Sequence, residues 1–417
     1  MIFVHCADLH LDSPFEGLRT YAPEMAEALR DATFQAFEHV IDLALREGAD
    51  FLLVAGDIYD SETRSLRAQL RFRDALRRAA ESGISCYVVH GNHDPLSGWE
   101  ARISLPDSVY RFGPSLDRLT VVCEGDDLAD IYGVSYPRVK VGENLASMFK
   151  RSGEAPFAIG LLHCNVGGDP NHENYAPCSL TDLREAGLDY WALGHIHSRA
   201  ILQSSEPCVV YAGNTQGRSV RELGPRGCYL VRVDATGQPQ PEFVATDAVR
   251  WFQEAVSITG LASEGDLLER LETAREEIRT SAEGRGALVR LRVSGRGELH
   301  PKLRRVDPER DLAAPLREDE ADRSDFVWTE SVELGTRPAL DLEQRRQVQD
   351  FVGDFLRLTQ AHREGPDVGA TMREMMDPVP GSRLVRETLN GLTEDEWQQI
   401  LDDAEGYGLD RLLVEEE

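Results

Sequence analysis

The stretch SCYVVHGNHD, residues 85–94, places an amide, an imidazole and a carboxylate directly after an apolar run. Residues 86–89 have the length and the β-branched and aromatic content of a buried strand. A turn after such a strand needs Gly91 and accepts Asn92, but turn chemistry has no use for His93 followed by Asp94. We therefore interpret these polar residues as part of a functional site at the end of a strand.

Further polar motifs lie at or just beyond the ends of other predicted strands. They are Asp8-Leu9-His10, Gly56-Asp57, His163 and Gly194-His195-Ile196-His197. The carboxyl ends of strands in an α/β sheet are where loops converge, so these side chains are expected to lie together. In D-x-H and H-x-H the polar residues are two positions apart, so in an extended chain they project to the same side.

The chemistry of this set predicts a metal centre. Carboxylates, imidazoles and an amide oxygen suit Mn²⁺, Mg²⁺, Fe or Zn²⁺ better than a thiolate site would. The candidate ligands are too many for one catalytic ion but enough for two ions that share a carboxylate, and they are Asp8, His10, Asp57, Asn92, His163, His195 and His197. Asp57 is the natural shared ligand.

His93 and Asp94 are assigned to catalysis. His93 is expected to stand near a reacting phosphate, where it stabilises charge or protonates the leaving oxygen. Asp94 is expected to fix the His93 ring. Because two metal ions activate water for in-line attack on phosphorus, the predicted reaction is hydrolysis of a phosphoester.

The order D-x-H, GD, GNHD, H, GHxH resembles that of the calcineurin-like metallophosphoesterases. Longer matches resemble their DNA repair exonuclease branch, the SbcD-type nucleases and most closely the YhaO-type proteins. These matches are HCADLHLDSPF (5–15), GDIYD (56–60), VVHGNHDP (88–95), LGHIH (193–197) and YAGNTQGRSVRELGPRGC (211–228). Asp12 follows Leu11 where SbcD-type proteins have glycine, which favours the YhaO-type branch. The resemblance covers about the first 230 residues.

The resemblance implies how the ligands divide between two ions. One ion is held by Asp8, His10, Asp57 and His197, and the other by Asp57, Asn92, His163 and His195. It also implies a cytoplasmic, Mn²⁺-dependent exonuclease of DNA repair, possessing single-strand endonuclease activity, which dimerises and works with an SbcC-like coiled-coil ABC ATPase. The chain contains no P-loop motif, so that ATPase must be a separate chain. Arg218 and Arg221, in the glycine-rich segment 213–227, are expected to contact the DNA backbone.

Alternating apolar runs and amphipathic stretches predict an α/β fold. The predicted strands are 1–6, 51–56, 85–90, 119–123, 130–136, 157–163, 190–194, 208–212 and 227–233, and the helices are 23–48, 62–82 and 180–187. The resemblance implies that they form the metallophosphoesterase four-layer β-sandwich flanked by helices. Residues 237–241, within TGQPQP, read as a linker.

The chain of 417 residues is too long for one ordinary core. We predict a dimetal phosphoesterase domain at 1–245, a small α+β capping domain for DNA access at 249–335, and a C-terminal helical region at 336–417 that docks a partner. In the last region, one apolar helical face is predicted from Val348, Phe351, Val352, Phe355 and Leu358. Thr393 and Glu396 predict a capping box for a final helix.

Composition limits the alternatives. The N-terminus has no apolar leader and no run approaches the ~20 apolar residues of a membrane span, which predicts a cytoplasmic protein. The net charge of −28 argues against coating of nucleic acid by bulk attraction. It mildly favours a second hypothesis, a phosphodiesterase acting on nucleotides or small phosphodiesters. A third, a non-catalytic scaffold, is disfavoured because a scaffold is free to lose ligands and this chain keeps the whole set.

Overall fold

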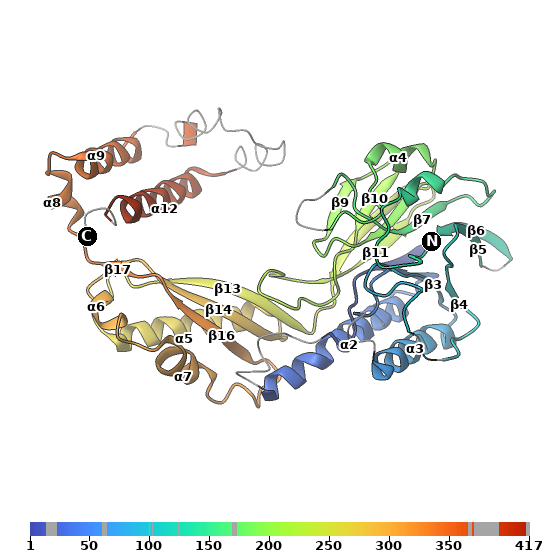
Figure 1. Ribbon diagram of the computed structural model, residues 1–417, viewed down its shortest axis with the longest axis horizontal. Helices are drawn as coiled ribbons and strands as arrows, with labels where there is room; N and C mark the ends of the chain where they lie inside the picture. Colours follow the sequence, from blue (N-terminus) through green and yellow to red (C-terminus); the bar gives the residue numbers. More distant parts are fainter. Residues whose placement is uncertain are drawn as a thin grey trace. The chain divides into compact units, whose positions relative to one another are not determined.

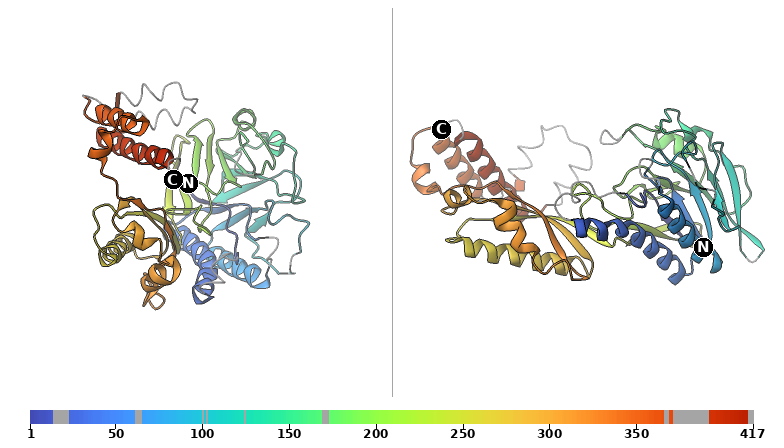
Figure 2. Two further views of the ribbon diagram at one scale, coloured as in Figure 1. Left: turned by 60° about the vertical axis from the view of Figure 1, so that its left-hand side comes forward. Right: turned by 60° about the horizontal axis from the view of Figure 1, so that its bottom comes forward.

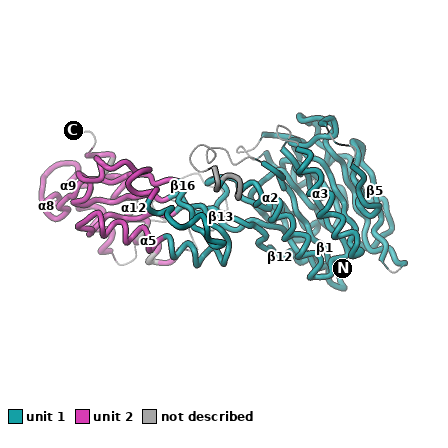
Figure 3. The backbone as a smooth tube through the Cα atoms, turned by 90° about the horizontal axis from the view of Figure 1, so that it is seen from below, with its two compact units in different colours: residues 1–253, 275–290, 315–330 teal, residues 254–274, 291–314, 331–417 magenta. Residues whose placement is uncertain are grey.

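The structure is a computed structural model. It describes residues 1–13, 23–60, 65–99, 101, 103–123, 125–168, 173–365, 369–370 and 392–413. The described chain divides into two compact units (Figure 3). Unit 1 comprises residues 1–253, 275–290 and 315–330, and unit 2 comprises the remaining described residues from 254 onward. Among the described helices, none combines the length and the apolar character that a membrane crossing requires.

Unit 1 contains a mixed sheet built around the N-terminal strand. Its strands are, in order, β12 (Pro239–Ala245), β11 (Gly227–Val233), β1 (Ile2–Cys6), β2 (Phe51–Ala55), β3 (Ser85–Val89) and β4 (Val109–Arg111). Strands β1 to β4 run parallel to one another, whereas β11 is antiparallel to β1 and β12 is antiparallel to β11. The carboxyl ends of β1, β2 and β3 therefore lie at one edge of the sheet.

A second sheet in unit 1 is also largely parallel. Its strands are, in order, β5 (Asp117–Cys123), β6 (Asp126–Gly133), β7 (Ala158–His163), β8 (Tyr190–Gly194), β10 (Cys208–Tyr211) and β9 (Ala200–Gln203). Strands β6, β7, β8 and β10 run parallel, and the edge strands β5 and β9 are antiparallel. The carboxyl ends of β7 and β8 again lie together.

Alternation along the strands sorts side chains between the two faces of each sheet. Phe51 and Leu53 of β2, with Ile159 and Leu161 of β7, belong to one buried cluster between the sheets. The intervening residues of the same strands face outward into two other clusters. Both faces of each sheet are therefore buried, which explains why the strands read as continuous apolar runs.

Helices cover the outer faces of both sheets. The helices α2 (Pro23–Arg46) and α3 (Leu66–Glu81) lie side by side (Figures 1 and 2) and pack Phe37 and Phe72 on the first sheet. On the second sheet, α4 (Leu180–Glu185) and the short η2 (Leu145–Met148) contribute to the cluster around Trp191. Helix, sheet, sheet and helix make the predicted four layers, so the predicted fold class is confirmed.

The predicted strands of this region are present, and the predicted linker is wrong. The chain turns at residues 234–237, and Pro239–Ala245 then forms β12, paired along its length with β11. Two prolines misled the prediction, because proline cannot donate to a sheet ladder. Strand β12 is an edge strand, however, and an edge tolerates proline. The short strands β4 and β9 also escaped prediction, and residues 62–64 of the predicted second helix lie outside the described chain.

The C-terminal part begins with a small α+β module. Its sheet has the order β13 (Val249–Ser257), β14 (Gly286–Ser294) and β16 (Val327–Leu334), with α5 (Glu264–Ser281) between β13 and β14 in the chain. The other short elements are β15 (Arg296–Gly297), α6 (His300–Leu303), η3 (Pro308–Ala313), α7 (Ala314–Arg317) and β17 (Arg337–Pro338). The division into compact units passes through this module, so the bounds of the three predicted domains stay a prediction.

The final helices of unit 2 are α8 (Leu342–Arg346), α9 (Phe351–Arg363) and α12 (Glu394–Leu413). The capping box is confirmed, because Thr393 and Glu396 exchange hydrogen bonds between side chain and backbone. The predicted apolar face is correct only in part: Val352 and Phe355 pack on the cluster that contains Leu409 of α12, whereas Val348 is exposed. Val352 and Leu356 are buried against Leu409 of α12, while Phe351 and Leu358 are exposed. The face that packs against α12 is therefore shifted from the predicted one and shares Val352 and Phe355 with it.

Gly194 offers a test of the packing between the sheets. A Cβ at this position would lie 2.0 Å from the Ala55 carbonyl oxygen, and backbone cannot move aside as a side chain can. We expect Gly194→Ala to lower the free energy of unfolding by about 3 kcal/mol or more, measured by guanidinium denaturation. Gly142→Ala, whose Cβ would meet no atom within 4 Å, is the control and should change stability by less than about 1 kcal/mol. Equal stability of the two variants would contradict the packing described.

Candidate metal centre

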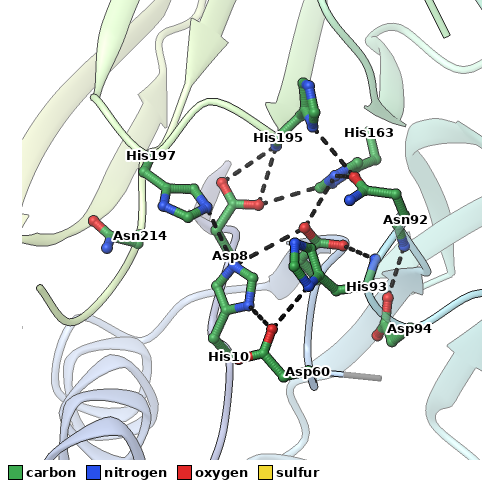
Figure 4. Close-up of polar contacts among 12 residues, drawn as sticks. Asp8, His10, Asp60, Asn92, His93, Asp94, His163, His195, His197 and Asn214 are labelled. Atoms are coloured by element: carbon green, nitrogen blue, oxygen red, sulfur yellow. Dashed lines mark hydrogen bonds and ion pairs between the residues drawn. The ribbon is translucent and has the colours of Figure 1, made fainter. Parts of the chain in front are cut away.

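The polar residues predicted from the strand ends meet in space. Asp8 and His10 follow β1, Asp57 follows β2, Asn92 and His93 follow β3, and the remaining histidines end β7 or follow β8 (Figure 4). Ligand atoms of Asp8, His10 and His197 lie within 4.8 Å of one another, and so do those of Asp8, Asp57 and His163. Loops from both sheets therefore converge on one buried cluster.

Two imidazole rings direct a lone pair at the same oxygen. His163 donates its Nδ1–H to the Ala55 carbonyl at 2.9 Å, which leaves the Nε2 lone pair 3.0 Å from Asn92 Oδ1. His195 lies 2.8 Å from the Glu173 carbonyl through Nε2, and its Nδ1 is 3.2 Å from the same Oδ1. A carbonyl can only accept, so the protons of the neutral rings lie on the outer nitrogens. The inner atoms are all acceptors.

A second pair of rings repeats this arrangement. His10 Nδ1 lies 3.2 Å from an Asp60 oxygen, and His197 Nδ1 lies 2.7 Å from an oxygen of Glu222. Their Nε2 atoms face each other at 3.2 Å. Since a carboxylate fixes the proton of a histidine on the near nitrogen, both inner nitrogens present lone pairs.

Acceptors that face acceptors repel unless a cation lies between them. The Asp57 carboxylate lies between the two pairs, with Oδ2 3.4 Å from His163 Nε2 and 3.9 Å from His10 Nε2. Asp8 and Asp57 are almost fully buried, and two buried carboxylates without a counter-ion are costly. The donor set therefore fits divalent cations that prefer oxygen and nitrogen, with Asp57 within reach of both groups.

The ionisation of these groups follows the same logic. Burial lowers the pKa of His10 to about 4, so its ring is neutral at pH 7. Burial alone would also lower the pKa of His163, but the carboxylates of Asp57 and Asp8 raise it to about 9, so at pH 7 a proton on the inner Nε2 takes the place that a cation would otherwise fill. Burial would raise the pKa of Asp57, yet His163 beside it holds that pKa well below its usual range. The centre therefore attracts positive charge, whether as protons or as metal ions.

The backbone of the candidate ligands is strained. Asp8, His10, Asp57 and His195 have φ values of 50°, 42°, 50° and 98°. This left-handed region costs a non-glycine residue on the order of 1 kcal/mol, and residues strained in this way tend to cluster at functional sites. Sharp bends at the end of β1 turn both Asp8 and His10 of the D-x-H motif toward the centre. The extended backbone that was expected for this motif is therefore wrong, although its two side chains do lie together.

Gly91 allows the backbone to approach the candidate ligands closely. A Cβ there would lie 2.3 Å from Asp57 Oδ1 and 2.8 Å from His163 Nε2. The backbone of the GNHD loop therefore approaches the carboxylate that the two groups share, and the His93 amide donates to the same Oδ1 at 2.9 Å.

The predicted contact between Asp94 and the His93 ring is wrong. Asp94 accepts hydrogen bonds from the backbone amides of Gly91 and Ile58, at 2.8 and 3.0 Å, and from His90 Nδ1 at 3.1 Å. It thus ties the GNHD loop to the loop that carries Asp57. The ring of His93 pairs instead with Asp60, with 2.8 Å between Nδ1 and Oδ1.

The His93 side chain is 42% exposed, whereas those of His10 and His163 have no exposure. It is therefore open to a substrate, while the candidate ligands beneath it are enclosed. Asp60 pairs with Nδ1 of its ring, so Nε2 is the ring nitrogen that this ion pair leaves for a substrate (Figure 4). Asp60 and the neighbouring Asp57 raise the pKa of His93 against the effect of burial.

Known protein families match this chain over both its N-terminal and its middle parts. Residues 1–199 match the model of the calcineurin-like phosphoesterase family, and residues 251–337 match that of the middle domain of metallophosphoesterase YhaO. The chain is 39% identical over 339 residues to an uncharacterised metallophosphoesterase, YhaO, of Bacillus subtilis, with 79% of this chain and 80% of that protein covered. The chain belongs to the calcineurin-like metallophosphoesterases. Within that family it fits the YhaO-type branch, as the sequence motifs predicted.

More distant relatives of this metallophosphoesterase include the DNA double-strand break repair proteins Mre11 of Aeropyrum pernix and Sulfurisphaera tokodaii. The identities are 27% over 246 residues and 26% over 215 residues, covering 56% and 48% of this chain. The chain spans 58% and 50% of the length of these two proteins. Superposition on a dimetal phosphatase from Danio rerio gives a TM-score of 0.33 at 12% identity, covering 55% of this chain and 92% of that chain.

Two residues that hold this metallophosphoesterase centre were missed by sequence analysis. Asp60 serves both His10 and His93, and Glu222 serves His197. Asp60 stands in the quoted motif GDIYD, three positions after Asp57, and this spacing was the available signal. Glu222 lies 25 positions after His197, within the quoted match at 211–228, but no spacing in that segment marked it as the partner of His197.

The predicted DNA-contact residues differ from each other in the structure. Arg218 lies against the centre, where NH1 donates to Asp60 Oδ2 and Ser13 Oγ, both at 3.1 Å. Arg221 is exposed. One part of the Arg218 guanidinium is therefore committed to Asp60, while the Arg221 side chain faces solvent. Their contact with DNA stays a prediction.

The position of Asp57 between the two groups generates a prediction. Asp57→Ala should lose both ions, because each cation then lacks the carboxylate that balances its positive charge. Elemental analysis of desalted protein measures this, and Asp42→Ala, which removes an exposed carboxylate paired with Arg78, is the control. One ion still bound at wild-type affinity would rule out a shared ligand.

Asp60, and not Asp94, pairs with the His93 ring, and variants of the two aspartates test this difference. Asp60→Asn should lower kcat on bis(4-nitrophenyl) phosphate by about 10-fold or more, since the partner of His93 loses its charge. Asp94→Asn should lower the free energy of unfolding by about 1 to 3 kcal/mol, because it disturbs a buried acceptor of backbone amides. Denaturation and kinetics on both variants separate the effects. An Asp94 variant of full stability, with only kcat reduced, would restore the assignment that the structure overturns.

Proposed function

We propose that this metallophosphoesterase is a dimetal-dependent DNA nuclease that hydrolyses phosphodiester bonds in DNA repair, as an exonuclease with single-strand endonuclease activity. The observation that carries the proposal is the set of inward lone pairs that share Asp57. The Mre11 relatives, named for repair of double-strand breaks, support DNA as the substrate.

The residues divide into two sets of ligands and a catalytic group. Asp8, His10, Asp57 and His197 would hold one ion, and Asp57, Asn92, His163 and His195 the other. Two bound divalent ions supply a nucleophile from water and neutralise phosphate charge. His93, open to the substrate and held by Asp60, stabilises the phosphate or gives a proton to the leaving oxygen.

A phosphodiesterase acting on nucleotides or small phosphodiesters is the second candidate. The observation that favours it is the net charge of −28, which repels a polyanion at long range. The same centre serves both reactions, because the chemistry at phosphorus is identical. Mn²⁺ as the native metal, the homodimer and the separate SbcC-like ATPase stay predictions from the resemblance, and the cytoplasmic location stays a prediction from the sequence.

The substrate is tested by incubating the purified protein with end-labelled single- and double-stranded DNA, bis(4-nitrophenyl) phosphate and cyclic nucleotides. Mn²⁺, Mg²⁺ and a chelator are compared for each substrate. We expect Mn²⁺-dependent shortening of DNA that the chelator abolishes. Turnover of cyclic nucleotides without any cleavage of DNA would favour the second candidate over the first.

The role of His93 is tested in the same assay. His93→Ala should lower DNA hydrolysis by about 100-fold to 10,000-fold while both ions remain bound, because His93 contacts the substrate and the seven ligands are unchanged. His39→Ala, which removes an exposed histidine bonded to the Thr246 carbonyl, should cleave at the wild-type rate. Hydrolysis by the His93 variant within threefold of the wild-type rate would refute the assignment.

A further inference from the structure

The loop between β10 and β11 supports one half of the centre. Within it, Glu222 accepts a hydrogen bond from His197 through Oε1 and one from the backbone amide of Arg218 through Oε2, both at 2.7 Å. The Arg218 guanidinium in turn contacts Asp60, which pairs with His10. The loop therefore fixes the outer nitrogens of His10 and His197 through two carboxylates.

Trp251, near the start of β13, holds this loop at two points. Its Nε1–H donates to the Gly217 carbonyl at 3.2 Å, and its own carbonyl accepts from the Gly224 amide at 3.0 Å. The two glycines stand on either side of Glu222 in the chain. A Cβ on Gly217 would lie 3.2 Å from the Trp251 ring and 2.8 Å from the Glu222 carbonyl oxygen, so the loop and the indole are in close contact.

The surroundings of Trp251 hold it in place. It is 4% exposed and belongs to a buried cluster with Met25, Leu29 and Leu288, against which Val220 of the same loop also packs. Gln216 adds a second link, because its amide accepts from the Ala248 and Val249 backbone and donates to the Val249 carbonyl. The start of β13 and the Glu222 loop are thus joined by both packing and hydrogen bonds.

The other half of the centre has different supports. His163 is held by the Ala55 carbonyl at the end of β2, and His195 by the Glu173 carbonyl. Neither residue belongs to the Glu222 loop or to β13. A disturbance of Trp251 should therefore reach the pair formed by His10 and His197 and leave the pair formed by His163 and His195 unchanged.

We propose that Trp251 is a positioning residue for one of two metal ions, the one assigned to His10 and His197, and that it acts through Glu222. Trp251 is the first residue that matches the YhaO middle domain, so this domain helps to set the affinity of one metal site in the phosphoesterase domain. The inference rests on the proposed dimetal function and adds a residue outside the ligand set.

The test is Mn²⁺ binding by calorimetry and elemental analysis. Trp251→Phe keeps an aromatic ring in the cluster and removes the Nε1–H donor. We expect one ion to bind about fivefold more weakly, the factor that corresponds to one ordinary hydrogen bond, and the other to bind as in the wild type. Trp328→Phe is the matched control, because Trp328 packs on the same cluster and its Nε1 has no hydrogen-bond partner among the described residues. This control should bind both ions as the wild type does.

Glu222→Gln keeps the test decisive if Trp251→Phe unfolds, which thermal melting would reveal. It should weaken the same ion by about 10-fold to 100-fold, and adding Trp251→Phe to it should weaken that ion no further. Wild-type affinities in Trp251→Phe, or equal weakening of both ions, would overturn the inference while the proposed function stands. A wild-type protein that binds no Mn²⁺ would overturn both.

Discussion

Four imidazole rings donate their outer N–H groups to carbonyl or carboxylate oxygens, and this constraint governs the rest of the centre. It fixes the tautomer of each ring and turns each lone pair inward, toward carboxylate and amide oxygens that also only accept. Such a cluster is electrostatically unfavourable by itself and favourable around cations. The fold supplies the outer acceptors from three separate segments, at residues 55–60, 173 and 222, so the centre cannot be separated from the architecture around it.

The two sheets explain how these segments meet. Parallel strands bring the ends of β1, β2 and β3 together in one sheet and those of β7 and β8 in the other, while the apolar cluster between the sheets holds the edges side by side. At these ends the backbone of Asp8, His10 and Asp57 enters the left-handed region, which isolated strands would avoid. Packing on both faces of each sheet offsets this local cost.

Most of the fold and most of the candidate ligands could be predicted from the sequence, and particular residues show where prediction failed. Continuous apolar runs located strands such as β2 and β7, and the polar motifs at their ends located Asp57, Asn92 and His163. Helical spacing could not decide which apolar face of α9 packs against α12, and apolar patterning could not show that β12 is an edge strand that tolerates Pro239. Side-chain pairing was the harder problem. Asp94 follows His93 in the chain, yet the sharp loop turns its carboxylate to backbone amides and leaves His93 to Asp60.

The central claim is that the inward lone pairs enclose two cations that share Asp57. Anomalous diffraction from crystals grown with Mn²⁺ measures this most directly, at wavelengths on either side of the manganese edge. The account predicts two peaks, one beside His10 and His197 and the other beside Asn92, His163 and His195, with the Asp57 carboxylate touching both. A single peak, or peaks away from these side chains, would contradict it.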